Sequence, residues 1–334
     1  MMKAVKFLGR GRVEVQDVPR PTARGDVVVV RVTSSGICGT DLELLLPIER
    51  PLTATPGHEV AGIVAEVDEA RRFHVGDRVI VNCHVTCCRC EHCRAGDLIF
   101  CPDLKAIGFD MDGGDAEYLA IPEASLQPLP QDISDELGVI IGDALGTPFH
   151  AAKKAEIAPG QTVGVFGVGP LGQMAVLVAK SRGARVIAID LNPVRLGAAE
   201  AFGADHLVNP GREDVLVTIR RLTGGRGLDK TLQCTPSAAA FTAALNGLRP
   251  RGRMIQVGVC TSVEVNPLEQ INNREIEILG SRNCNANELP ELIEFVRQYP
   301  KVNDVITHRF PLVEAPAAFA AATRGQGCKI LLKP

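Results

Sequence analysis

The first third of the chain has the short-period pattern of β-strands. Apolar and polar residues alternate through Val13-Glu14-Val15, and Val27–Val30 is a continuous run of β-branched residues. Further strand-like runs, separated by Gly and Pro residues, occupy positions 60–67, 78–81 and 118–122. Ser134 then begins a helical stretch that ends near residue 141. The pattern predicts a β-rich region built from many short strands.

From Gln161 the pattern changes to alternating strands and helices. A strand is expected at 162–166, a helix from Leu171 toward Arg182, and a second strand at 185–190. The alternation continues with helices at 193–203, 213–222 and 237–247 and with strands at 206–208, 229–234 and 253–259. This pattern predicts an α/β fold with a doubly wound parallel sheet.

The uncharged run from Thr162 to Ala179 is long enough to resemble a membrane span. Four glycines and Pro170 divide it into a strand, a turn and a helix, so we interpret it as protein core. After residue 280 the pattern changes again, to a helix with Leu292 and Phe295 on its apolar face and strands at 306–310 and 329–332. Domain boundaries are therefore expected near 145 and 285.

Composition narrows the class of protein. The chain has 334 residues and a net charge of −3, so two domains are expected, and nothing suggests nucleic acid or a membrane as a partner. The N-terminus lacks the apolar segment and cleavage site of a secretory signal, which predicts a cytoplasmic location. In a reducing compartment, the clustering of 11 cysteines indicates metal binding more than disulfides.

Four cysteines have the spacing of a structural zinc site. The pattern is Cys87-x2-Cys90-x2-Cys93-x7-Cys101, and four thiolates leave no open position on the metal. An iron–sulfur cluster and reactive surface thiols are the alternatives, although the bacterial cluster motif has three residues before its fourth cysteine, where this chain has seven. The nearby Cys83 and Cys88 are spare, and Cys88 could compete as a ligand.

A second ligand set lies in Cys38-Gly39-Thr40-Asp41 and Gly57-His58-Glu59. A thiolate, an imidazole and a carboxylate together suit Zn²⁺. Each of these residues alone is more often a packed core residue. From its position in the sequence, Asp143 is expected at the end of a helix, where such residues are usually caps. It can bind the same metal only if the fold brings it close to Cys38 and His58.

A glycine-rich turn follows the first strand of the α/β region. It contains Gly167, Gly169 and Gly172, with Pro170 and Leu171 at the start of the helix, and Asp190 ends the next strand 23 residues after Gly167. The glycines allow a pyrophosphate to approach the helix N-terminus, and Asp190 would accept hydrogen bonds from ribose hydroxyls and repel a 2′-phosphate. The turn therefore predicts NAD binding, with a ligand-free glycine turn as the alternative.

Taken in order, these three features resemble the zinc-containing medium-chain alcohol dehydrogenase family over essentially the whole chain. The residues 38–41, 273–282 and 307–311 are most similar to its polyol branch, which includes sorbitol dehydrogenase, threonine 3-dehydrogenase and sugar-acid dehydrogenases. The resemblance implies a GroES-like β-rich catalytic domain with the structural zinc lobe, formed by residues 1–145 and 286–334. It implies a Rossmann NAD-binding domain at 146–285.

The resemblance also implies roles for individual residues. Cys38 and His58 would bind a catalytic zinc with Asp143 or Glu59, and Asp41 would orient His58. Thr40 would carry a proton outward, with Glu43 at the position where many relatives have a relay histidine. Further cofactor contacts are expected from Thr147, Leu171, Arg195, Val257 and Val259. The chain differs from many members of the family at Asp68 and Cys88, where those members have glycine.

Arg282, with Asn283 and Asn285 beside it, is the candidate substrate residue, because the matching arginine of polyol relatives lies near substrate hydroxyls. The alternative is that Arg282 caps a strand end or pairs with Glu288. The expected reaction is hydride transfer between a secondary alcohol (a polyol, sugar or sugar acid) and NAD, with two zinc ions per chain and a homodimer or homotetramer as the assembly. The alternatives are a zinc-free NAD(P)H quinone or enoyl reductase of the same superfamily, and a non-catalytic nucleotide-binding protein.

Overall fold

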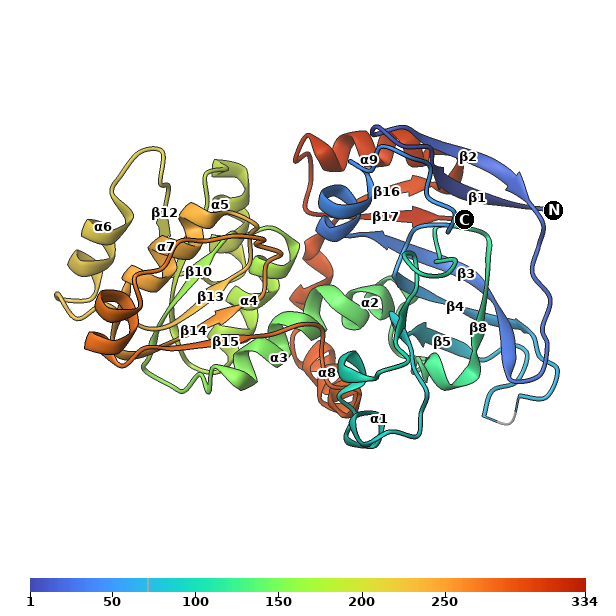
Figure 1. Ribbon diagram of the computed structural model, residues 1–334, viewed down its shortest axis with the longest axis horizontal. Helices are drawn as coiled ribbons and strands as arrows, with labels where there is room; N and C mark the ends of the chain where they lie inside the picture. The colour runs from blue at the N-terminus through green and yellow to red at the C-terminus, as the bar shows by residue number, and fades with distance from the viewer. Residues whose placement is uncertain (71) are drawn as a thin grey trace. The chain divides into compact units, whose positions relative to one another are not determined.

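The computed structural model describes residues 1–70 and 72–334, and the side chains of these residues except Leu44 and Leu45. The described chain divides into two compact units (Figure 1). One unit consists of Met1–Asp143 together with Asn285–Pro334, and the other is Ala144–Cys284. The first is β-rich, and the second alternates strands and helices. The mixed α/β fold class predicted from the sequence is confirmed.

The β-rich unit is organised around the long strand β3 (Val27–Ile37). In the part of the chain that the structure describes, its main sheet has the order β16-β17-β3-β4-β5-β9, and β8 also pairs with β3. The C-terminal strand β17 lies antiparallel to β3 and parallel to β16, so both ends of the chain contribute to one sheet. The other strands are β1 (Met2–Phe7), β2 (Val13–Val18), β4 (Glu59–Glu66), β5 (Arg78–Val81), β6 (His84–Val85), β7 (Lys105–Ala106), β8 (Tyr118–Pro122), β9 (Leu126–Pro128), β16 (Ile306–Pro311) and β17 (Lys329–Lys333).

Among the described residues, two large apolar clusters and a small one of Met2, Ala4 and Ala116 stabilise this unit. Val28, Val30 and Val32 of β3 project into a core with residues of β4, β5 and β8, which accounts for the run of β-branched residues in the sequence. Phe7 and Phe319, whose ring centroids lie 5.0 Å apart, belong to a second core that also includes β17. The helices of the unit are α1 (Glu91–Ala95), α2 (Asp135–Ile140), α8 (Leu289–Gln298) and α9 (Ala315–Thr323).

The α/β unit, all of whose residues are described, contains a parallel sheet of order β12-β11-β10-β13-β14-β15. The order reverses at β10, as in the doubly wound fold that the sequence predicts. Its strands are β10 (Thr162–Phe166), β11 (Arg185–Ile189), β12 (His206–Val208), β13 (Leu228–Gln233), β14 (Leu248–Gln256) and β15 (Glu277–Gly280). Its helices are α3 (Gly146–Lys154), α4 (Pro170–Ser181), α5 (Pro193–Ala201), α6 (Val215–Leu222) and α7 (Ala238–Asn246).

One predicted strand differs from the structure. The sequence pattern placed a strand at 253–259, but β14 is Leu248–Gln256, so Val257 and Val259 lie beyond its end. Pro250 and Gly252 suggested a later start, because both residues normally interrupt strands. The strand nevertheless pairs with β13 through an irregular register between Leu228 and Lys230, which accommodates them.

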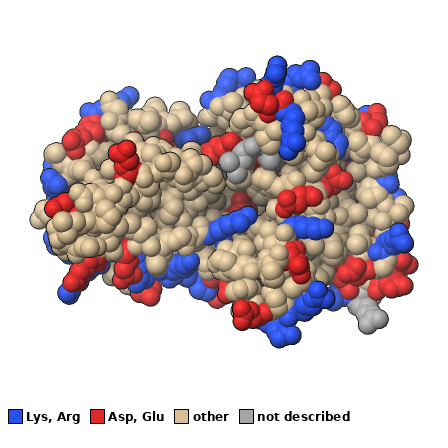
Figure 2. All heavy atoms as spheres, in the orientation of Figure 1, with Lys and Arg blue, Asp and Glu red and all other residues tan. Residues whose placement is uncertain are grey.

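Two observations concern the exterior. Within the described residues, no helix has both the length and the apolarity needed to cross a bilayer. The run from Thr162 to Ala179 instead divides into β10, the glycine turn and α4. On the face drawn in Figure 2, Lys and Arg side chains alternate with Asp and Glu side chains over both units, and neither sign forms a continuous patch there.

Candidate metal centres and cofactor site

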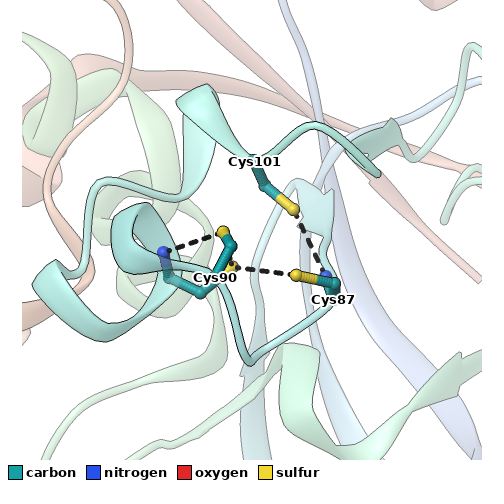
Figure 3. Close-up of side chains that lie close together, drawn as sticks. Cys87, Cys90 and Cys101 are labelled. Carbon is teal, nitrogen blue, oxygen red and sulfur yellow. Dashed lines mark hydrogen bonds between the residues drawn. The ribbon is translucent and has the colours of Figure 1, made fainter.

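The cysteine lobe brings four thiols together by local structure. Cys90 caps the short helix α1, and its Sγ accepts a hydrogen bond from the Cys93 N–H at 3.4 Å. The Cys87 N–H donates to Cys101 Sγ at 3.3 Å, which brings the far end of the loop back to its start. Figure 3 shows the labelled Cys87, Cys90 and Cys101 side chains around a common centre.

The sulfur positions fit a tetrahedral metal. The Cys90 and Cys93 sulfurs are 3.4 Å apart, and those of Cys87 and Cys93 are 3.9 Å apart. Zn–S bonds of about 2.3 Å in a tetrahedron separate their sulfurs by about 3.8 Å. Hydrogen bonds from the Arg89 and Cys90 backbone N–H groups lower the pKa of Cys87 to about 6, which favours the thiolate that a metal requires.

Cys88 does not join this group. Among the described residues, the cluster whose ligand atoms lie within 4.8 Å of one another consists of Cys87, Cys90, Cys93 and Cys101. The exposed Cys88 has a positive φ of 55°, and its sulfur lies 3.8 Å from Thr86 Oγ1. Cys83 is buried, with its sulfur 3.2 Å from His84 Nδ1. The four thiols that lie together are thus the four of the predicted zinc motif, and Cys88 is not among them.

The second cluster is assembled by strand register. Cys38 directly follows β3 and His58 directly precedes β4, and these antiparallel strands pair so that Gly36 lies opposite Glu59. The end of one strand is therefore beside the start of the other, and Cys38 and His58 meet although 20 positions separate them in the sequence. Both side chains are buried.

A third candidate ligand lies on the helix that packs against this sheet. Ser134 caps α2, which contacts β3, β4 and β5 and continues into a π-helical turn, η4 (Ile141–Leu145), that carries Asp143. Asp143 Oδ2 lies 3.5 Å from Cys38 Sγ, and the carboxylate is buried. π-Turns within helices often occur at functional sites, because they redirect a side chain. Asp143 is therefore not merely a helix-end residue, the alternative that its position in the sequence suggested.

The geometry of this cluster fits a zinc ion. Ligand atoms of Cys38, His58, Glu59 and Asp143 lie within 4.8 Å of one another, and all four residues are buried. A tetrahedral Zn²⁺ with bonds of about 2.3 Å to sulfur and about 2.0 Å to oxygen separates those atoms by about 3.5 Å, the distance seen between Cys38 and Asp143. The donor set of thiolate, imidazole and carboxylate suits the same ion.

Asp41 supports two of these residues from η1 (Asp41–Leu45), a π-helical turn after Cys38. One carboxylate oxygen accepts a hydrogen bond from the Cys38 N–H at 2.9 Å. The other lies 3.3 Å from His58 Nδ1, an electrostatic contact without hydrogen-bond alignment. His58 thus turns Nδ1 toward Asp41, which leaves Nε2 for a metal, as in carboxylate–histidine–metal triads.

Glu59 has a partner that the sequence analysis missed. Lys329 Nζ donates to both carboxylate oxygens, at 2.6 and 2.7 Å, and both side chains are buried. In sequence, Lys329 is simply the first residue of a predicted strand; its only signal is a lysine beside the apolar Ile330-Leu331-Leu332. Its contact with Glu59 depends on β17 joining the N-terminal sheet, which no local pattern indicates.

The site carries surplus negative charge. Asp41, Glu59, Asp115 and Asp143 are all buried around it, opposite the ammonium of Lys329. Burial, together with the charge of Asp41, raises the pKa of Asp115 to about 7, although Ser35 Oγ donates to its carboxylate at 2.6 Å. Burial, followed by the charge of Asp143, also raises the pKa of the Cys38 thiol. A divalent cation would offset this accumulation.

The pKa of His58 is also raised, but for an imidazole a raised pKa favours the charged form. Burial lowers the pKa of His58, and the nearby Asp41 and Cys38 groups outweigh this effect and bring it well above its ordinary value. For Glu59, burial raises the pKa, and the Lys329 ammonium opposes that rise. These directions show how strongly the local environment favours a positive charge at the centre of the cluster.

Thr40 and Glu43 lie beside this cluster. The Thr40 hydroxyl is 3.6 Å from Cys38 Sγ, close enough to contact a ligand on the same metal. Glu43 lies on η1, and partial burial raises the pKa of its carboxyl above the ordinary value. The Thr40 hydroxyl therefore lies beside the cluster, and the relay role of the exposed Glu43 stays a prediction.

In the α/β unit, the glycine turn has the geometry of a phosphate-binding loop. Gly167 has a φ of +83°, and a Cβ on Gly172 would collide with the Gly167 carbonyl oxygen, so both positions require glycine. Pro170 is the first residue of α4, whose N-terminus faces the turn. Asp190 accepts hydrogen bonds from the N–H groups of Val168 and Asn192, both at 2.8 Å, which joins the end of β11 to the turn.

The other residues predicted to contact the cofactor lie just beyond the carboxyl end of β14 or on helices α3, α4 and α5. Val257 and Val259 follow β14, at the carboxyl edge where ligands of such sheets bind. Arg195 lies on α5, and its Nε is buried with no hydrogen-bond partner among the described residues. Leu171 is half-buried in the first turn of α4, and Thr147 is buried in the first turn of α3.

Arg282 is exposed, just beyond β15. Its sequence neighbours contribute to structure. Asn285 and Glu288 form a capping box, and the Asn285 amide also donates to Asp97 Oδ1 at 2.7 Å, which fastens the cysteine lobe. Asn285 therefore has a structural role, whereas the role of Arg282 stays a prediction.

Comparisons with family models, curated proteins and solved structures all find similarity to alcohol dehydrogenases, and the similar proteins align over nearly the whole chain. A family profile described as "Alcohol dehydrogenase GroES-like domain" matches residues 24–131, and one described as "Zinc-binding dehydrogenase" matches residues 170–298. An L-threonine 3-dehydrogenase of Rhizobium etli is 31% identical over 99% of each chain, and a sorbitol dehydrogenase of Halalkalibacterium halodurans is 32% identical over 98% of this chain and 97% of its own. The structure of an alcohol dehydrogenase from Thermus sp. ATN1 has a TM-score of 0.92 at 30% identity, covering 99% of each chain. The similarity thus extends over both units.

Proposed function

Because the chain belongs to the zinc-containing medium-chain alcohol dehydrogenase family of oxidoreductases, we propose that it transfers a hydride between a secondary alcohol and NAD at the Cys38–His58–Asp143 cluster. The observation that carries this proposal is the 3.5 Å separation of Cys38 Sγ and Asp143 Oδ2 beside the buried His58 imidazole. A zinc-free reductase or a non-catalytic nucleotide-binding protein has no need of three buried metal-binding side chains at this spacing.

Each residue of the cluster has a separate task. Cys38, His58 and Asp143 would hold the catalytic Zn²⁺, and Asp41 holds both the Cys38 backbone and the His58 ring in place. Bound there, Zn²⁺ would supply a Lewis acid that lowers the pKa of a substrate hydroxyl. The Thr40 hydroxyl, 3.6 Å from Cys38 Sγ, would receive the proton and pass it outward, with Glu43 or solvent as the terminus. The four cysteines of the lobe would hold a second, structural zinc.

The cofactor proposal depends on Asp190. A carboxylate at the end of β11 would accept hydrogen bonds from the ribose hydroxyls of NAD and repel the 2′-phosphate of NADP. The orphaned Nε of Arg195 is a donor that could offset part of that repulsion. The pyrophosphate would lie on the N-terminus of α4, where the N–H groups of the first turn face it.

For the substrate we propose a polyol, sugar or sugar acid. Arg282 would contact it, because a guanidinium has fixed donors that match vicinal hydroxyls or a carboxylate. The curated relatives reported above act, by their names, on threonine and sorbitol, both of which are hydroxylated polar molecules. A homodimer or homotetramer remains our expectation for the assembly.

The experiment is a substrate panel with the purified protein. Polyols, sugar acids, amino alcohols and short primary alcohols are each offered with NAD⁺ or NADP⁺, and the reduced nicotinamide is followed by its absorbance. The proposal expects turnover of a hydroxylated substrate, with a higher kcat/KM for NAD⁺. Removal of the catalytic zinc should abolish that turnover; activity that survives it would favour the zinc-free reductase.

Arg282→Ala in the same assay tests the substrate class. The loss of a charge-assisted hydrogen bond, worth about 1.5–3 kcal/mol, should raise KM for the best polyol or sugar acid roughly 10–100-fold. Any activity on a short primary alcohol should change little, since that substrate has no second hydroxyl to contact. Equal losses on both substrates would assign Arg282 to structure instead.

A further inference from the structure

The end of the short helix α1 in the cysteine lobe is capped by a distant part of the chain. The last carbonyl groups of a helix have no partner inside it. Here Ala95 O accepts hydrogen bonds from the side-chain amides of Asn285 and Asn287, both at 3.1 Å. Gly96 O accepts one from the Ala286 N–H at 3.0 Å. The later segment therefore supplies donors that the helix itself lacks.

Asn285 uses both ends of its side-chain amide. Its nitrogen donates to Ala95 O at 3.1 Å and to Asp97 Oδ1 at 2.7 Å, so both amide hydrogens are bonded to the lobe. Its oxygen accepts a hydrogen bond from the Asn287 N–H at 2.9 Å and caps the 3₁₀-helical turn η7 (Ala286–Glu288). One side chain thus holds the lobe and begins the next helical turn.

The lobe is shaped to receive these asparagines. Gly96 has a φ of +81°, and a side chain there would collide with those of Asn285 and Asn287. The helix that they cap carries Cys93, and Cys90 caps its other end. The contact is therefore made to the element that positions two of the four thiols.

The capping segment lies where the chain passes from one unit to the other. Cys284 is the last residue of the α/β unit, and Asn285 belongs to the β-rich unit. Arg282 is three residues before Asn285, so their Cα atoms are at most about 10 Å apart. On the other side of Arg282, the Ser281 N–H donates to Gln256 O at 2.9 Å, just beyond β15. Arg282 therefore lies on a short link that is held at both ends.

We propose that Asn285 is a positioning residue for substrate binding, because it holds one end of the link that carries Arg282. A link fixed at both ends restricts the positions of the guanidinium, so less conformational entropy is lost when a substrate binds. Release of the lobe end would weaken the binding of a polyol or sugar acid without altering the reacting groups. This inference rests on the proposed function, since it assumes that Arg282 contacts the substrate.

Three variants separate the lobe contact from the helix cap. Asn285→Asp keeps the capping oxygen, because aspartate caps helices as well as asparagine does, but it places a carboxylate against Ala95 O and Asp97. Asp97→Ala removes the acceptor from the lobe side and leaves the capping segment unchanged. The double variant Asn285→Asp with Asp97→Asn exchanges donor and acceptor, which restores their hydrogen bond. Asp132→Asn is the control, because it breaks an exposed ion pair with Arg297 at the far end of α8.

The readouts are substrate affinity and local hydrogen exchange. Asn285→Asp and Asp97→Ala should each raise KM for the best polyol or sugar acid about 3–10-fold, the effect of losing one hydrogen bond. Their kcat values and their KM for a short primary alcohol should stay close to wild type. Deuterium uptake of the peptide 281–288 should quicken in both variants, because the Ala286 N–H is less firmly held. The double variant and Asp132→Asn should resemble the wild type in both readouts.

Two results would overturn the positioning role of Asn285. One is an unchanged polyol KM in both Asn285→Asp and Asp97→Ala. The other is an equal rise in KM for the polyol and the short alcohol, which would assign the contact to general stability. If Asn285→Asp does not fold, Asp97→Ala alone decides, since it leaves the capping segment intact.

The Arg282→Ala protein distinguishes this inference from the proposed function. In that background Asn285→Asp should raise the polyol KM no further, because its effect acts through Arg282, and an additive rise would contradict the inference. An Arg282→Ala protein with a wild-type polyol KM would instead refute the proposed substrate contact itself, whatever the Asn285 variants show.

Discussion

The two candidate metal clusters of this protein are built in opposite ways. In the lobe, all ligands lie between Cys87 and Cys101, three of the four residues are partly exposed, and a five-residue helix and a loop position them. In the second cluster, Cys38 and Asp143 are 105 positions apart, every ligand is buried, and a sheet and a covering helix bring them together. The first consists of four cysteine sulfurs, and the second combines different donors, with Lys329 and further carboxylates around it.

The difference fits the structural and catalytic roles that we propose for the two clusters. Four thiolates satisfy a zinc ion completely, so the lobe needs only a loop of the right length. A catalytic metal needs an open position, and its remaining ligands must be held by groups that do not bind it themselves. Asp41, which contacts both Cys38 and His58, is such a group, and its position depends on the folded unit. Substitutions in the two clusters should therefore have separable effects.

Cys38→Ser should give the largest effect. The loss of a thiolate removes a catalytic metal worth several kcal/mol of transition-state stabilisation, so kcat/KM should fall about 10³-fold or more. Zinc should fall from about two to about one per chain, because the lobe keeps its ion. NAD affinity should change little, since the glycine turn and Asp190 belong to the other unit. Turnover and metal content check this, and a fully active variant would refute the metal assignment.

Cys93→Ser should lower the thermal stability of the protein more than it lowers the catalytic activity. A lobe with three thiolates binds zinc weakly, and the folding energy that the metal supplied is lost, so Tm should fall by roughly 5–15 °C. Cys88→Ser is the matched control, because Cys88 is exposed and its sulfur lies outside the cluster. Calorimetry and zinc content distinguish the two variants. A Cys93→Ser protein with full zinc and an unchanged melt would contradict a structural role for the lobe.

Asp41→Asn should have an intermediate effect confined to the second cluster. It removes the charge beside His58 Nδ1 and weakens the 2.9 Å hydrogen bond from the Cys38 N–H. Outer partners of metal ligands typically contribute 10–100-fold to affinity or activity, so a decrease of that size is expected in kcat or zinc affinity. Chelator competition measures the affinity. If both parameters were unchanged, Asp41 would have no orienting role.

The surplus carboxylates predict a small pH effect. Burial raises the pKa of Asp115 to about 7 from 3.8, so in this range the folded protein binds more protons than the unfolded chain, and this residue lowers stability as pH rises. In chelator-treated protein, Asp115→Asn should gain a few °C in Tm over wild type, with the gain growing between pH 4 and 7 and constant above. A gain that does not vary with pH would show that Asp115 does not titrate.

Much of this architecture could be predicted from periodicity and spacing. Short runs of β-branched and apolar residues predicted β3, β5, β8 and the succession from β10 to β13, because each strand carries its own pattern of buried residues. The lobe and the glycine turn could be located for a similar reason: their ligands or contacts lie within one loop, so spacing alone brings them together. The start of β14 could not be placed, since its pairing with β13 overrides the local preferences of Pro250 and Gly252.

What the sequence determined by itself is therefore the chemistry that is local: four thiols in a loop, glycines before a helix, an acid at a strand end, and the residue types Cys38, His58 and Asp143. Tertiary structure alone decided which of these groups meet. It brought Asp143, which the sequence suggested as a helix cap, next to Cys38. It left Cys88 outside the lobe cluster. It also paired Lys329 with Glu59, 270 positions away in the sequence. The physical reason is that strand register and sheet order bring these groups together, and both are set by the burial of a whole core rather than by any short segment.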